Sequence, residues 1–217
     1  MSQTYTFAFV DLAGFTALTD AHGDQTAAEQ VDRFTTLARQ ALTGSASIVN
    51  VVGDAVLLVA QDEEQQVQDA LTSTLALLEA CIAEPAFPLA RGGIHTGTAV
   101  RSGTEFFGSG VNITARVTAH AAGGELVLTT APAREARARG LRVHDLGAVA
   151  LRNVAQDVEL YRLDLDCSQH AVDPVCRMTV RQPDAAGTLR YEGRDYWFCS
   201  LSCAASFAAN PDRHHAG

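Results

Sequence analysis

The chain has 217 residues, of which 47% are hydrophobic, and a formal net charge of −9. That length allows one well-packed core and a small second module, and the negative charge argues against nucleic acid or an anionic membrane as partner. No apolar run approaches the roughly 20 residues of a membrane helix, and the first residues lack a basic segment, so we expect a cytoplasmic protein. All 16 basic residues are arginines, which excludes a P-loop NTPase because that site needs a lysine.

The hydrophobic pattern alternates between the periods of strands and helices, which is typical of an α+β fold, an α/β sandwich, rather than a bundle. In chain order up to the middle, we expect a strand at 5–10, helices at 14–21 and 31–42, and a strand pair at 48–52 and 55–59 around the turn Gly53-Asp54. Beyond it we expect a helix at 67–82, a strand at 91–95, a helix carrying Asn112 and Arg116, and strands at 125–130, 141–144, 149–151 and 158–163.

Two aspartates stand where an apolar strand meets a turn. Asp11 follows FAFV and Asp54 follows IVNVVG. An isolated carboxylate at the end of a buried run is costly unless a cation neutralises it, and carboxylate oxygens are ligands for hard divalent cations. The pattern therefore predicts a site for Mg2+ or Mn2+ that binds phosphate groups.

Five segments carry a resemblance to a known family: FVDLAGFT, VVGDAVLL, GIHTG, FFGSGVNITAR and LGAVALRNVAQDVELYRL. In this order they resemble the class III nucleotidyl cyclase catalytic domain, to which we assign residues 1–164. The resemblance implies a ferredoxin-like βαββαβ core and a homodimer that binds a nucleoside triphosphate between its protomers. It also implies conversion of ATP to cyclic AMP and pyrophosphate.

The resemblance gives the residues their roles. Asp11 and Asp54 would hold two Mg2+ or Mn2+ ions on one subunit, and Asn112 and Arg116 would be catalytic residues from the other. Asn112 lies four residues before Arg116, so the two side chains share a helix face, with the amide orienting the ribose and the guanidinium stabilising the phosphorus centre. The backbone amides of a helix start suit the β- and γ-phosphates; these are Gly14, Phe15 and Thr16.

The purine-binding positions depart from the family pattern. Asn50 stands where the family has a lysine, and Glu105 where it has an aspartate. Lysine and aspartate together bind the N1 and N6 edge of adenine, whereas an amide donates or accepts and an ionised glutamate only accepts. We expect ATP over GTP, although these side chains alone do not decide between them. A phosphate-binding lysine of the family is also missing, and Arg152 is its candidate substitute.

The C-terminal segment has a different character, since four of the five cysteines follow residue 166. After a linker at 165–172, the segment 173–217 contains the pair Cys199 and Cys203 where a strand pattern changes to a helix pattern. DPVCRMTV and YEGRDYWFCSLSC resemble the YHS domain, a small zinc-ribbon-like module. A module of this size has little core, and metal binding or docking on a neighbour would stabilise it.

We expect Cys176, Cys199 and Cys203 to bind metal. Three thiolates with a fourth ligand suit Zn2+, and thiolates with Met178 suit Cu+. The candidates for the fourth ligand are His214, His215, Cys167 and His170. The alternative is that Cys199 and Cys203 are buried or disulfide-linked.

Two other functions are consistent with the sequence. One is a catalytically degenerate cyclase homologue that binds nucleotide or serves as a scaffold, with the YHS domain sensing metal or redox state. The other is a metal-handling protein whose large domain only dimerises. If the cyclase is active, the YHS module is a candidate regulator of it.

Overall fold

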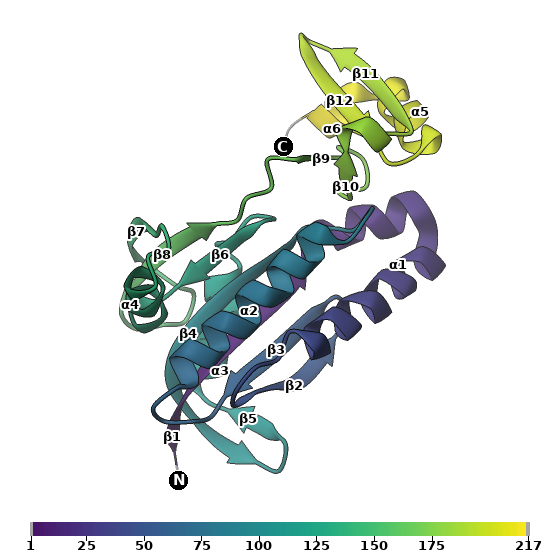
Figure 1. Cartoon of the computed structure of the whole chain (residues 1–217). Helices are drawn as coiled ribbons and strands as arrows, with labels where there is room; N and C mark the ends of the chain where they lie inside the picture. Colours follow the sequence, from purple (N-terminus) through teal and green to yellow (C-terminus); the bar gives the residue numbers. More distant parts are fainter. Residues whose placement is uncertain (1, 216–217) are drawn as a thin grey trace.

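The computed structural model describes residues 2–215. A large domain built on one sheet is followed by a small module of short strands and helices (Figure 1). The strands of the large domain are β1 Gln3–Leu12, β2 Ala46–Val52, β3 Ala55–Ala60, β4 Ala90–Ser102, β5 Glu105–Phe107, β6 Glu125–Leu128, β7 His144–Val149 and β8 Val158–Asp164. Its helices are α1 Phe15–Gln40, α2 Gln66–Ala83, α3 Ser109–Thr118 and α4 Thr130–Ala138. The module has β9 His170–Val172, β10 Thr179–Arg181, the 3-10 helix η1 Gln182–Asp184, β11 Gly187–Tyr191, β12 Arg194–Phe198, α5 Leu201–Ala209 and α6 Pro211–His215.

The large sheet has the strand order β2-β3-β1-β4-β6-β8-β7, with β5 paired to β4. The pair β4–β6 is parallel, and the other pairs are antiparallel. The first four strands with α1 and α2 form a βαββαβ unit in the order β2-β3-β1-β4. The ferredoxin-like core expected from the sequence is therefore confirmed.

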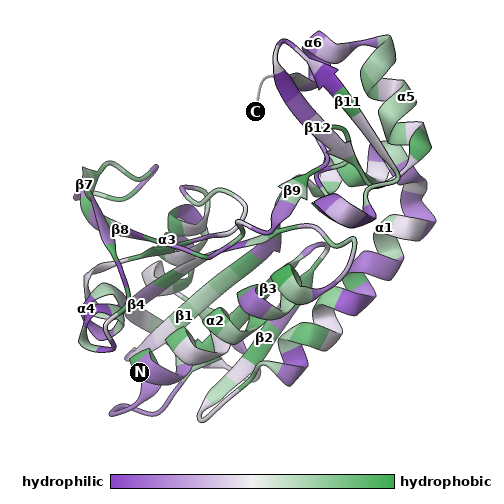
Figure 2. Cartoon of the chain, turned by 45° about the horizontal axis from the view of Figure 1, so that its top comes forward, coloured by the Kyte–Doolittle hydropathy of each residue, from purple (hydrophilic) through white to green (hydrophobic). Residues whose placement is uncertain are grey.

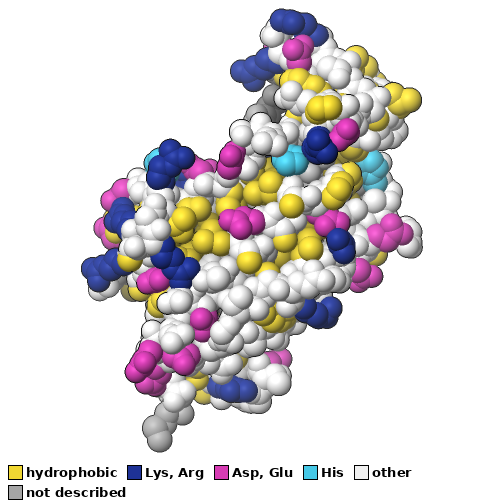
Figure 3. Space-filling view, viewed as in Figure 1, with side chains coloured by type: hydrophobic (Ala, Val, Ile, Leu, Met, Phe, Trp, Pro, Cys, Tyr) yellow, Lys and Arg dark blue, Asp and Glu magenta, His cyan; other side chains and the backbone are white. Residues whose placement is uncertain are grey.

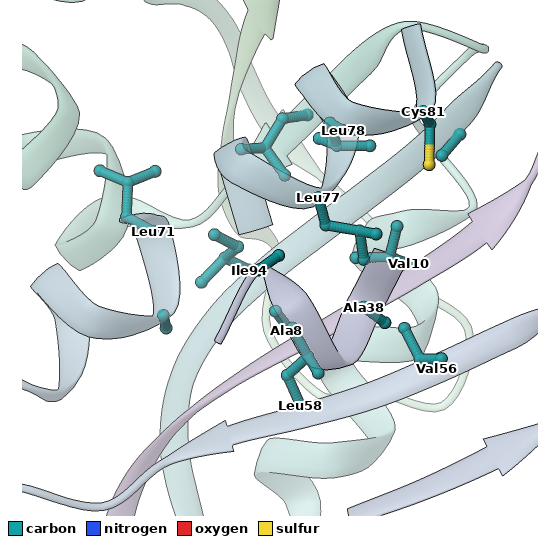
Figure 4. Packing of buried hydrophobic residues seen from close by; sticks show 14 of the residues in the cluster. Ala8, Val10, Ala38, Val56, Leu58, Leu71, Leu77, Leu78, Cys81 and Ile94 are labelled. Atoms are coloured by element: carbon teal, nitrogen blue, oxygen red, sulfur yellow. The ribbon is translucent and has the colours of Figure 1, made fainter. Parts of the chain in front are cut away.

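Helices α1 and α2 cover one face of this sheet (Figure 1). Figure 4 shows Leu77 and Leu78 of α2 close to Val10 of β1, with Ala38 of α1 beside Val56 of β3. All five side chains are at most 1% exposed. Full burial of a leucine side chain stabilises the fold by about 2 kcal/mol, so this layer is the main core. The strands beneath it are accordingly hydrophobic in Figure 2.

The opposite face of the sheet carries α3. The helix approaches the sheet closely because Gly97 of β4 faces Gly110 of α3. A Cβ added at Gly110 would lie 3.0 Å from the carbonyl carbon of Gly97 and 3.1 Å from Phe7 Cε2. Phe7 packs there with Tyr5 and Phe106, in ring contacts of 5.0 to 5.9 Å between centroids. Glycines therefore place α3 on the same face as the odd-numbered side chains of β1.

Three details differ from the expected elements. The strands expected at 141–144 and 149–151 are wrong in their bounds, since one strand, β7, spans the residues between them. The strand expected at 125–130 ends at Leu128, and an unexpected helix, α4, begins at Thr130. The two expected N-terminal helices form one element, α1, which is broken at Gly23 by a left-handed backbone (φ 83°, ψ 168°).

The small module is packed onto the large domain. The backbone N–H and the hydroxyl of Thr179 both donate to the carbonyl oxygen of Phe87, at 2.9 Å each. Leu18 and Ala27 of α1 share one apolar cluster with Val175, Phe198 and other residues of the module. The last three residues of the expected linker form β9, which pairs with β10.

The surface mixes charges of both signs. Figure 3 shows acidic and basic side chains interspersed over one face, and histidine side chains at the boundary between domain and module. Within residues 2–215, no helix combines the length and the apolar character that a bilayer crossing requires.

His95 of β4 makes a pH prediction possible. Burial lowers the pKa of His95 to about 4, and its Nδ1 lies 3.0 Å from Thr129 Oγ1. The unfolded chain takes up a proton near pH 6.5 and the folded chain does not, so stability is complete above that pH and is lost as pH falls towards 4. As the pH falls from about 7.5 to about 5, His95 alone should lower the free energy of unfolding by about 2 kcal/mol. Urea unfolding of His95→Gln should show a weaker acid-side loss than wild type; an identical loss in both would contradict the assignment.

Candidate active site and metal centre

The structure brings Asp11 and Asp54 together. Asp11 is the penultimate residue of β1 and pairs in register with Ala55, the first residue of β3. The backbone N–H of Leu12 donates to the carbonyl oxygen of Asp54 at 3.1 Å. Both aspartates are half-buried, at neighbouring strand ends. The alternation of β1 puts Asp11 on the face that carries Phe7, away from α1 and α2.

Arg91 of β4 is a member of this site that the sequence analysis missed. It stands opposite Asp11 in the β1–β4 register. Its Nε donates to Asp11 Oδ1 at 2.6 Å and its Nη2 to Oδ2 at 3.3 Å, so the pair is bidentate. The available signal was an arginine at the start of a strand of small and apolar residues, just before GIHTG.

The chemistry of the pair fits a hard divalent cation. Burial raises the pKa of Asp54 above its ordinary value; the charge of Asp11 adds to the rise, and Arg91 opposes it. Two carboxylates that disfavour each other's ionised form are stabilised by a cation with oxygen ligands. In this structure Arg91 supplies the countercharge to Asp11.

The start of α1 lies directly after Asp11. Gly14 is the N-cap residue, with a left-handed backbone (φ 78°), and no side chain caps the helix. The first N–H groups of an α-helix have no partner within the helix, so those at Phe15 and Thr16 are suited to an anion. Gly14 and Thr16 are exposed, which leaves this end of the helix accessible.

Asn112 and Arg116 lie on α3, in a hollow shared with the loop between β7 and β8. Asn153 and Val154 line the same hollow. Arg116 Nη1 donates to the carbonyl oxygen of Asn112 at 3.0 Å, one helical turn away. Neither Asp11 nor Asp54 lines this hollow. Within one chain the two expected halves of the site therefore lie in separate places.

The expected purine and phosphate positions are all exposed. Asn50 pairs with Leu57 across the β2–β3 hairpin, on the face of the sheet that carries α3. Glu105 opens β5, which passes close to β2. Arg152 lies in the turn between β7 and β8. β5 pairs with β4 and not with β2, so Asn50 and Glu105 lie on two strands that approach each other without being paired.

Three thiols and one imidazole meet where the module contacts α1. Cys199 Sγ lies 3.4 Å from Cys176 Sγ and 3.8 Å from Cys203 Sγ. His22 Nε2 of α1 lies 3.5 Å from Cys199 Sγ and 3.7 Å from Cys203 Sγ. The four ligand atoms all lie within 4.8 Å of one another. We call these four residues the thiol–imidazole cluster.

The imidazole beside the thiols is not one of the expected candidates for the fourth ligand, because it belongs to the large domain. Cys167 Sγ instead lies against Gly124, where an added Cβ would be 2.8 Å away. His214 stacks at 6.4 Å from the ring of Phe207. His170 is likewise outside the cluster, and the side chain of His215 lies outside the described residues. His22 precedes Cys199 by 177 positions, so no local spacing could indicate it.

The thiols have the electrostatics of a ligand set. All five cysteines are free. The hydrogen bond from Cys176 lowers the pKa of Cys199 to about 7, while burial raises the pKa of Cys203 to about 12. The same hydrogen bond, with burial, raises the pKa of Cys176. A thiol with a lowered pKa beside two further thiols suits a thiophilic cation.

Two family models match the chain. Residues 1–164 match the adenylate and guanylate cyclase catalytic domain, and residues 171–216 match the YHS domain. The match to the cyclase model covers most of the chain and includes the aspartates, Asn112 and Arg116.

Individual proteins agree with the larger match. The chain is 34% identical over 167 residues to the pH-sensitive adenylate cyclase MT1302 of Mycobacterium tuberculosis, which covers 75% of this chain and 41% of that protein. It is 33% identical over 128 residues to an adenylate cyclase of Streptomyces griseus, covering 58% of this chain and 31% of that one. The chain thus spans less than half the length of these relatives.

Solved structures share the fold. The adenylyl cyclase CyaB from P. aeruginosa superposes with a TM-score of 0.64 at 18% identity, over 75% of this chain and 94% of that chain. The guanylate cyclase domain of RhGC from Catenaria anguillulae, solved in complex with GTP, gives 0.61 at 15% identity, over 76% and 98%. From these matches we conclude that the chain belongs to the adenylate and guanylate cyclase catalytic domain family.

Proposed function

We propose that the protein is a purine nucleotide cyclase that converts ATP to cyclic AMP and pyrophosphate at a homodimer interface. The observation that supports this most is the meeting of Asp11 and Asp54 beside the uncapped start of α1. In the reaction the ribose 3′-oxygen loses its proton and bonds to the α-phosphorus. The bond from that phosphorus to the bridging oxygen breaks, and pyrophosphate leaves with the electron pair.

The aspartates would hold Mg2+ or Mn2+. Divalent cations in this position would lower the pKa of the 3′-hydroxyl and neutralise the triphosphate. To bind a cation, Asp11 would give up its ion pair with Arg91. The guanidinium of Arg91, released from that ion pair, would then be able to contact a phosphate oxygen. The N–H groups at Phe15 and Thr16 bind the terminal phosphates.

The second half of the site comes from the partner subunit in this proposal. Asn112 and Arg116 lie in a hollow of their own in one chain, and the symmetric pairing of two chains supplies them to the aspartates of the other. Arg116 places positive charge on the α-phosphate oxygens as the phosphorus gains a bond. Asn112 orients the ribose.

ATP is the favoured substrate because the named relatives are adenylate cyclases. Asn50 and Glu105 would contact the purine, with Arg152 near the phosphates. We place the domain at 1–164 and the YHS module at 173–217, joined by 165–172, and the module regulates the cyclase.

Activity with MnATP and MnGTP tests the proposal. Purified protein should form cyclic AMP, and Asp11→Asn, which keeps the shape but loses the charge, should lower the rate at least ~10³-fold because several kcal/mol of charge stabilisation disappear. Thermal unfolding of the variant serves as the folding control. Absence of a cyclic product from both nucleotides would contradict the proposal.

One observation favours a second function. Asn50 and Glu105 replace both purine-binding side chains of the family, and the chain has no lysine. A nucleotide-binding scaffold that does not cyclise would have these features. It would bind MnATP in calorimetry without releasing pyrophosphate.

A further inference from the structure

We propose that the thiol–imidazole cluster is a tetrahedral Zn2+ site that fastens the YHS module to the first segment of α1. Its ligands come from two modules of the chain, with His22 supplied by the cyclase domain. The metal centre is therefore a clamp between domains rather than an internal staple of the module.

The geometry of the four atoms supports this assignment. Zn2+ binds sulfur at about 2.3 Å and imidazole nitrogen at about 2.05 Å, so a regular tetrahedron has S···S edges of about 3.8 Å and S···N edges of about 3.6 Å. The S···S distances from Cys199 are 3.4 and 3.8 Å, and the S···N distances to His22 are 3.5 and 3.7 Å. A disulfide would need sulfur atoms about 2.05 Å apart. Four of the six distances between the ligand atoms are close to those of the tetrahedron, and the other two are at most 4.8 Å.

A buried carboxylate, that of Asp173, orients the backbone beside the thiol–imidazole cluster. Asp173 is 0% exposed, and its oxygens accept N–H bonds from Val175 and Cys199 at 2.8 Å each and from Cys176 at 3.4 Å. One side chain thus orients the two loops that carry the first two thiols. Once ionised, the three thiols and this carboxylate would concentrate negative charge in a site of low exposure, which a divalent cation would offset.

The module contacts the first segment of α1 at both of its ends, near Gly14 and at His22. His22 is the last residue before the break at Gly23. Next to Cys176, Arg177 has a left-handed backbone (φ 66°), and its side chain contacts one side of Gly14. A Cβ added at Gly14 would lie 2.5 Å from Arg177 Cγ. Metal binding therefore fixes residues 14–22 against the module.

The consequence for catalysis rests on the proposed function, whereas the metal centre does not. If residues 14–16 bind phosphates, loading the cluster orders that segment before the nucleotide arrives. Loss of the metal would raise the KM for MnATP.

Cobalt titration of the full-length protein tests the ligand set. After removal of bound metal, wild type should bind one Co2+ with the visible absorption of a tetrahedral thiolate site. His22→Ala should bind it at least ~10-fold more weakly, because one of four ligands is missing. His22→Cys should restore binding and strengthen the thiolate-to-cobalt absorption. His120→Ala, an exposed histidine of the same domain, is the matched control.

Hydrogen exchange tests the clamp. Removing the metal from wild type should increase amide exchange in residues 15–22, and His22→Ala should show the faster exchange with or without metal. Unchanged Co2+ affinity and spectrum in His22→Ala would overturn the proposal, as would uptake of Cu+ without any Co2+. Neither readout involves nucleotide, so an inactive cyclase leaves this test intact, and an unfilled cluster leaves the cyclase assay intact.

Discussion

Mixing Asp54→Ala protein with Arg116→Ala protein is expected to restore about a quarter of wild-type cyclase activity, although each variant alone should be inactive. Random pairing makes half of the dimers mixed. In a mixed dimer one site receives both lesions, and the other has its aspartates from one chain and its guanidinium from the other. Arg116→Ala alone should lower the rate about 10²–10³-fold, because a preorganised positive charge is lost from the phosphorus centre.

The measurement is cyclic AMP formation by variants mixed at equal concentration, compared with each variant alone. Arg142→Ala is the control partner, because this exposed arginine lies outside α3. Mixing Arg142→Ala protein with Asp54→Ala protein should give activity in proportion to the fraction of sites that have intact aspartates. If the mixture of the two inactive variants stays inactive while mixed dimers are detected, the site is formed within one chain.

The double substitution Asn50→Lys with Glu105→Asp is expected to raise kcat/KM for ATP by about 10-fold or more. Lysine and aspartate would provide the donor and acceptor that match the adenine edge, and unmatched polar contacts cost a substrate orders of magnitude in kcat/KM. Both positions are exposed, so the new side chains should not disturb the fold.

The readout is the ratio of kcat/KM for MnATP and MnGTP, with each single substitution measured beside the pair. Gln40→Lys, an exposed change at the end of α1, controls for the added lysine charge. A fall in the ATP value together with a rise in the GTP value would show that Asn50 and Glu105 already suit adenine and that the family pattern does not transfer here.

The parts of the fold that the sequence predicts well are those with a strong local signal. Alternation and helical stripes give β1, the β2–β3 hairpin, α2 and β8, because each buries one continuous apolar face. The bounds of β7 were wrong, since that strand is mostly exposed at the sheet edge and its residues show little alternation. α4 was missed because its residues, TAPAREARA, carry only a narrow apolar stripe.

The candidate site residues likewise divide into those with a local sequence signal and those without one. Asp11 could be predicted because it lies at the end of a buried strand, Asp54 because it directly precedes one, and the three cysteines because thiols cluster in a short segment. Arg91 and His22 could not be predicted, because their roles come from pairing between distant segments. Arg91 needs the β1–β4 register, and His22 needs the module to fold back onto α1.

The exposed apolar side chains beside the proposed site have a consequence for how the protein behaves in a cell. Val52, Val100 and Phe107 are 62%, 44% and 57% exposed, at the turn next to Asp54 and around β5. In the proposed homodimer a second chain would cover this surface, which is otherwise unfavourable in water. Output per molecule would then depend on how abundant the chain is: at low expression most copies would be single and silent, and a modest increase in synthesis would produce a disproportionate increase in the messenger nucleotide.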